Sequence, residues 1–311
     1  YQRRVHGPIL HNSISIFPPF DSPMAVTLSS SSFLHNSISN VSSPMSLLPS
    51  LRHLTLTSKA RSVSLSAVRQ GTLGWTAAPL SLVQPAAEDL FHVSIDVSAS
   101  SDIAASHARA GQYVQVRVLG NEKPSFLAIA SPPSLSVTGV FEFLVKSVSG
   151  STAEAICRLR KGDVVEITPA MGNGFELDRI SPPSDFPSVL IFATGSGISP
   201  IRSLIENGFD AEIRSDVRLF YGARNLSRMA YQDRFKAWEA SGVQLVPVLS
   251  QPDGSWAGEK GYVQAAFSKR KHIITPNGTA AVLCGHKQMA EDVTSMLVAE
   301  GVSAEKILKN F

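Results

Sequence analysis

The stretch SVLIFATGSGISPIRSLIE (188–206) decides the fold of the second half of the chain. Its apolar run VLIFA (189–193) is typical of a buried strand in a parallel sheet. A turn with Gly195 and Gly197 follows, and Pro200 stands in the first turn of a predicted helix. Because glycines let the backbone approach a pyrophosphate and the helix N-terminus faces its charge, the stretch predicts a phosphate-binding turn. It is neither a strict G-x-G-x-x-G nor a Walker A motif, so the surrounding pattern has to support it.

The same strand-then-helix order continues to the C-terminus. Further strands are predicted at 217–224, 243–250 and 280–285, and further helices at 229–242, 261–270 and 286–301. This alternation predicts a doubly wound α/β domain with a parallel sheet over residues 186–311. In such a sheet the ligand lies beyond the C-terminal ends of the strands. The residues expected there are Gly195, Arg224, Ser250 and Cys284.

The first half of the chain alternates with a period of two. Apolar and polar residues take turns in FHVSIDV (91–97) and QYVQVRV (112–118), which is typical of half-buried strands. Two more strands are predicted at 140–148 and 163–170. Short strands separated by Gly, Pro and Ser predict an antiparallel barrel or sandwich over residues 72–182.

One helix is predicted inside this half, over residues 151–163, directly after Gly150. Ser151 or Thr152 is its expected N-cap. A helix start after a glycine binds anions readily, because free N–H groups and the positive end of the helix dipole meet there. A plain N-cap explains the same three residues, and from the local sequence alone it is the better explanation.

The first 70 residues differ in charge from the rest of the chain. They hold six of the 28 basic residues and one of the 25 acidic residues, so the formal charge of +3 becomes −2 over residues 71–311. The basic balance of the whole chain is therefore no argument for a nucleic-acid partner.

The same segment predicts a cellular address. From Met24 to Gln70, 14 of 47 residues are Ser and none is acidic, while Arg and Lys are present. This composition indicates an organelle transit peptide, and the Met-Ala start favours the chloroplast, in the stroma or peripheral on the thylakoid. Residues 1–70 are therefore set apart from the fold, and a disordered tail without an address is the alternative.

The two cysteines, Cys157 and Cys284, are too few for a disulfide framework or a Cys-rich zinc or iron–sulfur site. No metal site is predicted. The longest apolar runs are too short to cross a bilayer, so no transmembrane segment is predicted either.

Six short motifs follow one another in an order that resembles one family. They are SGST (149–152), MGNGF (171–175), ATGSGISP (193–200), FYGAR (220–224), VLSQPDGSWAGEKGYVQ (248–264) and LCGHKQM (283–289). In this order, residues 88–311 resemble the ferredoxin–NADP reductase superfamily, most closely the plant plastid FAD/NAD(P)-binding oxidoreductases of the kiwi fruit-protein group. The resemblance implies an FAD-binding β-barrel followed by an NAD(P)-binding α/β domain. It also implies hydride transfer between nicotinamide and FAD, with electrons passed to an unknown acceptor such as a plastid electron-transfer protein.

The resemblance further implies roles for single residues. The segment 150–152 matches the cap of the FAD pyrophosphate, and Thr194, Gly195 and Gly197 match the pyrophosphate turn of the NAD(P) site. The residues implied near the nicotinamide and the flavin ring are Gly285 and Met289 as cofactor contacts, and Cys284 and Phe311 as catalytic residues.

Three residues follow the strand at which the family binds the adenosine ribose: Arg224, Ser227 and Arg228. A Ser and an Arg there suit a 2′-phosphate. No Asp or Glu follows the strand directly to hold a free 2′-hydroxyl, so NADP is favoured over NAD. Solvent-exposed loop residues are the alternative explanation for Ser227 and Arg228.

The family's flavin motif, Arg-x-Tyr-Ser, is not retained. The matching segment is KPSFLAIASPP (123–133), which has Ser125 at the Arg position, Leu127 at the Tyr position and Ala128 at the Ser position. The charged partner of the pyrophosphate and the ring stacked on the flavin are both missing. Because a lost charge-assisted contact costs about 1.5–3 kcal/mol, FAD is expected to be held loosely, held in a changed geometry, or absent.

Two functions remain open. The intact motifs of the second half favour a flavin-dependent NAD(P)H oxidoreductase, in which Lys123 or a shifted Phe126 substitutes for the missing contacts. The altered flavin motif favours the alternative, a flavin-free NADP(H)-sensing or scaffold protein that docks to a plastid complex. A subunit with its own [2Fe–2S] cluster is disfavoured, because the chain has only two cysteines.

Overall fold

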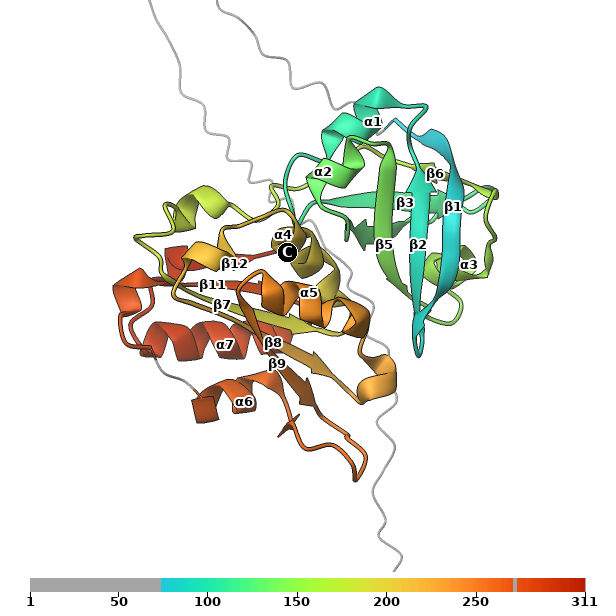
Figure 1. The fold of residues 1–311 in the computed structure, drawn as a ribbon. Coiled ribbons are helices and arrows are strands. Elements are labelled where there is room, and N and C mark those ends of the chain that lie inside the picture. The colour runs from blue at the N-terminus through green and yellow to red at the C-terminus, as the bar shows by residue number, and fades with distance from the viewer. Residues whose placement is uncertain (1–73, 271–272, 311) are drawn as a thin grey trace, which may run out of the picture. The chain divides into compact units, whose positions relative to one another are not determined.

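Two six-stranded sheets make up the part of the chain that the computed structural model describes, residues 74–270 and 273–310 (Figure 1). Both sheets fall within one compact unit, Ala67–Phe311, so the predicted domain boundary between 182 and 186 stays a prediction. The predicted targeting segment 1–70 and the predicted catalytic Phe311 lie outside the described residues.

The first sheet is antiparallel and has the strand order β4-β3-β6-β1-β2-β5. An isolated antiparallel bridge between Ile129 and Phe143 joins its two edges, so the sheet closes into a barrel. The strands are β1 (Thr76–Ala87), β2 (Leu90–Asp96), β3 (Tyr113–Val118), β4 (Ser125–Ala128), β5 (Val140–Lys146) and β6 (Val164–Ile167), and the helices are α1 (Ser101–Ser106), α2 (Pro133–Ser136) and α3 (Thr152–Arg158).

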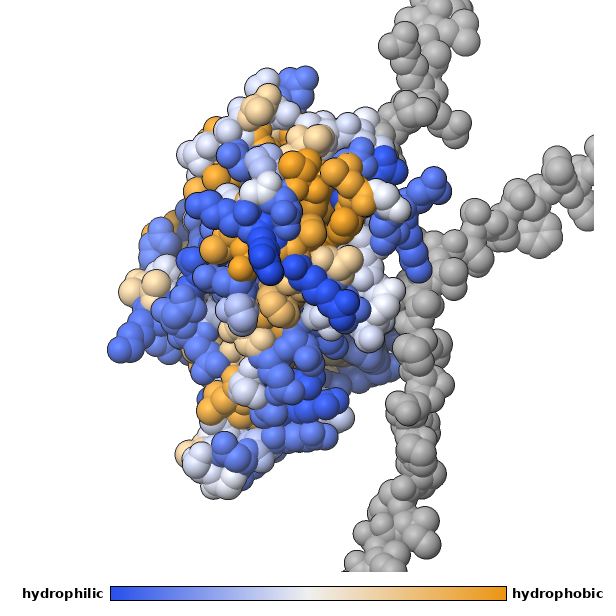
Figure 2. All heavy atoms as spheres, turned by 90° about the vertical axis from the view of Figure 1, so that its right-hand side faces the viewer, coloured by the Kyte–Doolittle hydropathy of each residue, from blue (hydrophilic) through white to orange (hydrophobic). Residues whose placement is uncertain are grey.

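The period-two pattern accounts for the barrel core. Val93 and Ile95 on β2 and Val114 and Val116 on β3 are fully buried. Each such side chain contributes about 1.5–3 kcal/mol when it leaves water. Figure 2 shows apolar side chains gathered in the upper part of one face. The exposed large apolar residues of the barrel are Leu119, Phe126, Val137, Val148 and Val164.

The second sheet is parallel throughout and has the order β10-β9-β8-β7-β11-β12. Its strands are β7 (Ser188–Thr194), β8 (Asp216–Ala223), β9 (Val243–Leu249), β10 (Glu259–Lys260), β11 (Thr279–Cys284) and β12 (Ile307–Lys309). Helices α4 (Ile198–Glu206) and α5 (Phe235–Ala240) cover one face, and α6 (Val263–Arg270) and α7 (Lys287–Ala299) cover the other. The predicted fold class, an antiparallel barrel followed by a doubly wound α/β sheet, is confirmed.

Two helices are shorter than predicted. The helix expected over 229–242 begins only at Phe235, because Tyr231 has a left-handed backbone with φ 62°. The helix expected over 151–163 ends at Arg158, because Leu159 is extended. The short 3-10 helices of the described residues are η1 (Leu177–Ile180), η2 (Gly195–Gly197), η3 (Ala211–Ile213), η4 (Leu226–Arg228), η5 (Gln232–Arg234), η6 (Pro276–Gly278) and η7 (Ala304–Lys306).

Arg202 on α4 links the two sheets. Its side chain is 5% exposed, its Nη2 donates to Glu142 on β5 at 2.5 Å, and its Nε donates to Glu206 at 3.0 Å. The neighbouring Ser203 hydroxyl donates to the carbonyl of Ser131, which follows β4, at 2.8 Å. The barrel and the α/β sheet are therefore held together by a buried ion pair and a buried hydrogen bond.

His107, between α1 and β3, predicts how stability depends on pH. Its Nδ1 contacts the Ser136 hydroxyl at 2.6 Å, while its buried Nε2 has no partner among the described residues. Burial lowers the pKa of His107 from 6.5 to about 4. The unfolded chain therefore binds the proton more tightly than the folded chain, and stability falls as pH drops from the unfolded value towards the folded one. We expect a loss of about 2 kcal/mol between about pH 7 and about pH 5.

Urea unfolding of the wild type and of His107→Gln at both pH values measures this loss. The variant does not titrate at this position, so its stability should change less over the same range. Equal pH dependence of the two proteins would contradict the assignment.

Candidate functional site

Two adjoining cavities lie at the C-terminal ends of the parallel strands. The first, of about 490 Å³, is called the Arg224 cavity here, and the second, of about 680 Å³, the Leu127 cavity. Both names refer to a residue in the cavity wall. The walls share five residues: Lys146, Thr194, Gly195, Ser196 and His286. Ligands in the two cavities would therefore meet at one boundary, formed by the end of β5, the turn after β7 and the residue before α7.

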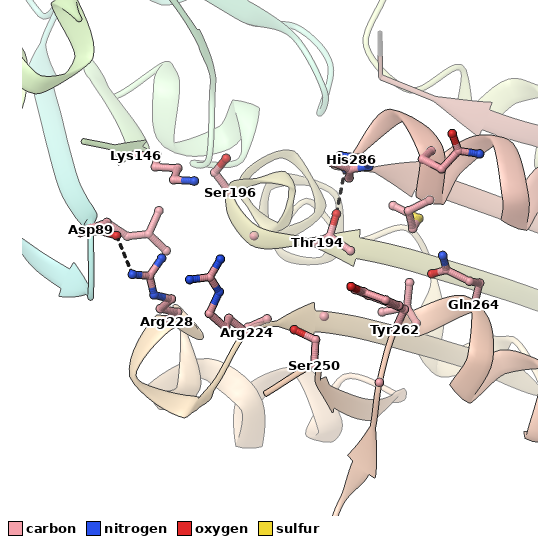
Figure 3. A pocket seen from close by; sticks show the side chains of 18 of the residues that line it. Asp89, Lys146, Thr194, Ser196, Arg224, Arg228, Ser250, Tyr262, Gln264 and His286 are labelled. Atoms are coloured by element: carbon pink, nitrogen blue, oxygen red, sulfur yellow. Dashed lines mark hydrogen bonds and ion pairs between the residues drawn. The ribbon is translucent and has the colours of Figure 1, made fainter. Parts of the chain in front are cut away.

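The predicted pyrophosphate turn forms this boundary. The Thr194 hydroxyl accepts a hydrogen bond from the backbone N–H of His286 at 2.8 Å, which joins the turn after β7 to the turn after β11 (Figure 3). Gly285 has φ +137°, and a Cβ there would lie 2.1 Å from the Thr194 hydroxyl oxygen. A Cβ on Gly197 would lie 2.5 Å from the carbonyl oxygen of Cys284. Glycine is therefore required at both positions, and the structure brings the residues predicted in these two turns together.

Positive charge lines the Arg224 cavity. Figure 3 shows Lys146, Arg224 and Arg228 directed towards the same side of it. Neither Lys146 nor Arg224 has an ion-pair partner among the described residues, and both are exposed. A phosphate group entering here would meet two unpaired cations beside the open N–H groups of a helix start.

Arg228 and Ser227 are already occupied, which changes what the sequence predicted for them. Arg228 Nη2 lies 2.7 Å from a carboxylate oxygen of Glu88 and 3.0 Å from one of Asp89. The Ser227 hydroxyl donates to Glu88 at 3.1 Å, or to Asn225 at 2.9 Å. Both carboxylates come from the turn between β1 and β2. One of the two reasons for predicting NADP, a Ser and an Arg that suit a 2′-phosphate, is weakened by these contacts, and the preference stays a prediction.

The Leu127 cavity receives the residues of the altered flavin motif. Ser125, Leu127 and Ala128 on β4 all line it, together with Leu144 on β5. Successive side chains of β4 point to opposite sides, so Leu127 is 8% exposed while Phe126 is 65% exposed at the edge of the same cavity. The wall combines aliphatic side chains on β4 and β5 with polar groups from the turns after β7 and β11, as ligand pockets commonly do.

The start of α3 reaches the wall of the Leu127 cavity through Ala153. Ser151 caps the helix by accepting from the N–H of Glu154 at 3.2 Å, and Glu154 accepts in return from the N–H of Gly150 at 2.8 Å. The Thr152 hydroxyl donates to the carbonyl of Lys123 at 2.6 Å. Ser151 is thus the N-cap, as predicted, and the Glu154 carboxylate bonds the residue before it, in a variant of the capping box. The implied role of Gly150, Ser151 and Thr152 at an FAD pyrophosphate stays a prediction.

Cys284, Gly285 and Met289 lie where the sequence placed them, at the end of β11 and the start of α7. Cys284 lines the Leu127 cavity and is 8% exposed, and burial raises the pKa of its thiol to about 12. The thiol therefore stays protonated at neutral pH and offers a packing surface rather than a nucleophile. Met289 lines the Arg224 cavity from the core below it, with 3% of its surface exposed.

Sequence reasoning missed several residues of the two walls. His286 stands at the start of a predicted helix, and Lys146 lies inside the strand predicted over 140–148, which ends two residues earlier in the structure. Tyr262 lines the Arg224 cavity from the segment after β10, and Ser250, which was predicted at a strand end, also lies in this wall. Glu88 and Asp89 carried no sequence signal, because their partners are 139 and 140 residues away.

Comparison with known proteins identifies the family. Residues 191–295 match the oxidoreductase NAD-binding domain family. The chain is 47% identical over 310 residues to the fruit protein pKIWI502 of Actinidia deliciosa, covering 96% of this chain and 92% of that protein. It is 30% identical over 200 residues to ferredoxin–NADP reductase B of Sorangium cellulosum, covering 61% and 79%. The chain belongs to the ferredoxin–NADP reductase superfamily.

Solved structures of this superfamily have the same fold. A crystal structure of a ferredoxin–NADP⁺ reductase from Neisseria gonorrhoeae with bound FAD and NADP has a TM-score of 0.62 at 19% identity, covering 76% of this chain and 99% of that chain. The predicted membership of the ferredoxin–NADP reductase superfamily is confirmed. Within the described residues, no group of three or more His, Cys, Asp or Glu residues is arranged to hold a metal ion, and no helix is long and apolar enough to cross a membrane.

The FAD that the ferredoxin–NADP reductase fold implies fits this chain in part. The Leu127 cavity, of about 680 Å³, has both aliphatic and polar residues in its wall. One expected pyrophosphate contact is missing, because position 125 holds a neutral Ser125. Lys123 is exposed and has no ion-pair partner in the described part of the chain, so it is the cation nearest in sequence to the missing contact.

Proposed function

We propose that the chain is an NAD(P)H oxidoreductase of the ferredoxin–NADP reductase type, with the dinucleotide in the Arg224 cavity and a flavin ring in the Leu127 cavity. The observation that carries the proposal is the wall that the two cavities share, formed by Lys146, Thr194 and His286 with the turn between them. A nicotinamide and a flavin reach each other across such a boundary. When bound, the flavin supplies the acceptor for a hydride and passes electrons on.

In this proposal, residues of the chain bind and orient the dinucleotide and the flavin. The turn after β7 offers backbone N–H groups to the pyrophosphate of the dinucleotide, and Lys146 and Arg224 offer positive charge. Leu127 and Leu144 exclude water from the ring on one side, and Cys284 packs at the boundary. No general base is required, since hydride transfer is the chemistry of the two cofactors.

An absorbance spectrum of the purified chain, taken before and after addition of FAD, tests the proposal. We expect the visible flavin band to remain with the protein after FAD is added and excess is removed, and to be lost on addition of NADH or NADPH without oxygen. Absence of a bound flavin band under these conditions would contradict the flavin part of the proposal.

A variant that restores the missing positive charge at position 125 gives a sharper test of FAD binding. Ser125→Arg returns the guanidinium of the family motif to the wall of the Leu127 cavity, and we expect it to tighten FAD binding roughly tenfold or more, from a charge-assisted contact of about 1.5–3 kcal/mol. Ser125→Ala is the matched control without charge. Equal FAD affinity of the two variants would show that the pyrophosphate lies elsewhere.

A second candidate function is a flavin-free protein that binds the dinucleotide only, as a sensor or scaffold. The altered flavin motif favours it, since position 125 holds a neutral Ser125 where the family motif has Arg. Binding of NADH or NADPH without any flavin binding would select this candidate.

The cellular setting belongs to the same proposal. The Ser-rich segment 24–70, which has no acidic residue, supports a plastid location. A plastid electron-transfer protein is the proposed electron partner. Import of the full chain into isolated chloroplasts, with loss of the segment, is the direct test.

A further inference from the structure

We propose that Glu88 and Asp89 select against a 2′-phosphate, so that the chain takes NADH in preference to NADPH. The two residues form the turn between β1 and β2 of the barrel and line the Arg224 cavity. This inference rests on the proposed function, in which that cavity holds the dinucleotide. It goes beyond that function by naming the residues that choose between the two forms.

The turn is fixed against η4 by main-chain and side-chain contacts. The backbone N–H of Glu88 donates to the carbonyl of Ser227 at 2.7 Å. The two oxygens of the Glu88 carboxylate take different partners, Arg228 Nη2 at 2.7 Å and the Ser227 hydroxyl at 3.1 Å. Asp89, which has φ 61°, brings a second carboxylate to the same Arg228 nitrogen at 3.0 Å. The carboxylates are therefore held in place and do not sample the cavity freely.

The carboxylates of Glu88 and Asp89 balance the positive charge of Arg228 without a ligand. The hydrogen bond from Arg228 and that from Ser227 lower the pKa of Glu88, so its carboxylate is ionised at neutral pH. Two carboxylates satisfy one guanidinium, and Arg228 has no free charge left for a phosphate. Lys146 and Arg224 have no ion-pair partner among the described residues, although the charge of Arg224 also helps to lower the pKa of Glu88, and both remain for the pyrophosphate that the two dinucleotides share.

The two carboxylates interact differently with the 2′-substituents of NADH and NADPH. The ribose 2′-hydroxyl of NADH is a hydrogen-bond donor, and an ionised carboxylate is a good acceptor for it. The 2′-phosphate of NADPH carries about two negative charges and is an acceptor only, so it is repelled by both carboxylates. An acidic residue on the ribose is a known way to select a free 2′-hydroxyl, and it usually stands after the second strand of the nucleotide-binding sheet. Here the acid comes from a hairpin of the other sheet.

Calorimetric titration of the full chain with NADH and with NADPH, without added flavin, measures the two Kd values. For the wild type we expect NADPH to bind at least tenfold more weakly than NADH. The variant Glu88→Gln/Asp89→Asn keeps the shape of the turn and its oxygen acceptors but removes both charges. It should tighten NADPH binding at least tenfold and change NADH binding less than threefold.

The control is Glu212→Gln/Glu239→Gln, which removes the same charge from exposed positions outside the cavity and should leave both Kd values unchanged. If the double variant does not fold, Glu88→Gln alone keeps the Asp89–Arg228 ion pair and should still move the ratio towards NADPH. Equal binding of the two nucleotides by the wild type, or an unchanged ratio in the variants, overturns this inference and leaves the proposed function standing. Binding of neither nucleotide overturns both.

Discussion

Replacing Gly285 with alanine is expected to weaken binding of NADH about 10- to 100-fold. The new Cβ would lie 2.1 Å from the Thr194 hydroxyl oxygen and 2.9 Å from the backbone nitrogen of the same residue. The backbone at Gly285, with φ +137°, is also one that an L side chain rarely adopts. Thr194 must therefore move, and the turn that faces the pyrophosphate moves with it. Strain of this kind costs about 1–3 kcal/mol, which corresponds to the stated loss of affinity.

Calorimetric titration with NADH measures this change. Gly254→Ala is the matched control, because nothing lies within 4 Å of a Cβ at Gly254 and its φ is not positive. The control should bind like the wild type. An unchanged Kd in Gly285→Ala would mean that the dinucleotide does not use this turn.

Replacing Arg202 with alanine is expected to lower the free energy of unfolding by about 3–5 kcal/mol. The loss would leave the partly buried Glu142 without its ion pair, at a place where Arg202 is 5% exposed, while Glu206 would keep Arg234 at 2.9 Å. Urea unfolding measures the change. Lys287→Ala, which breaks an exposed pair with Glu291 at 3.7 Å, should cost less than about 1 kcal/mol.

A double-mutant cycle separates the ion pair from the packing of the Arg202 side chain. Glu142→Gln in the Arg202→Ala background should cost less than Glu142→Gln in the wild type, because the partner charge is already gone. Additive losses would contradict a direct coupling between α4 and β5.

The elements that the sequence predicted well are those whose signal is local. Strand β7 is apolar over five successive residues because both faces of a parallel sheet are covered, and all five are fully buried. The turn after it was visible from Gly195 and Gly197 alone. The confirmed order of strands and helices follows from the same local periodicity.

The site was harder to predict where contacts come from afar. Arg228 looked like a free cation, since no acid stands near it in the sequence, yet Glu88 reaches it across 140 residues. At Gly150 and Ser151, where the contacts are local, the plain N-cap was the better explanation from the sequence, and Ser151 is the N-cap. A short motif shows which polar groups are present, but the fold determines which of them already have a hydrogen-bond or ion-pair partner.

The capping box of α3 has a consequence for how the molecule is made. The Ser151 hydroxyl and the Glu154 carboxylate accept from backbone N–H groups at this helix start, so α3 has partners supplied by its own sequence. We therefore expect the helix to form in the barrel whether or not a nucleotide is present.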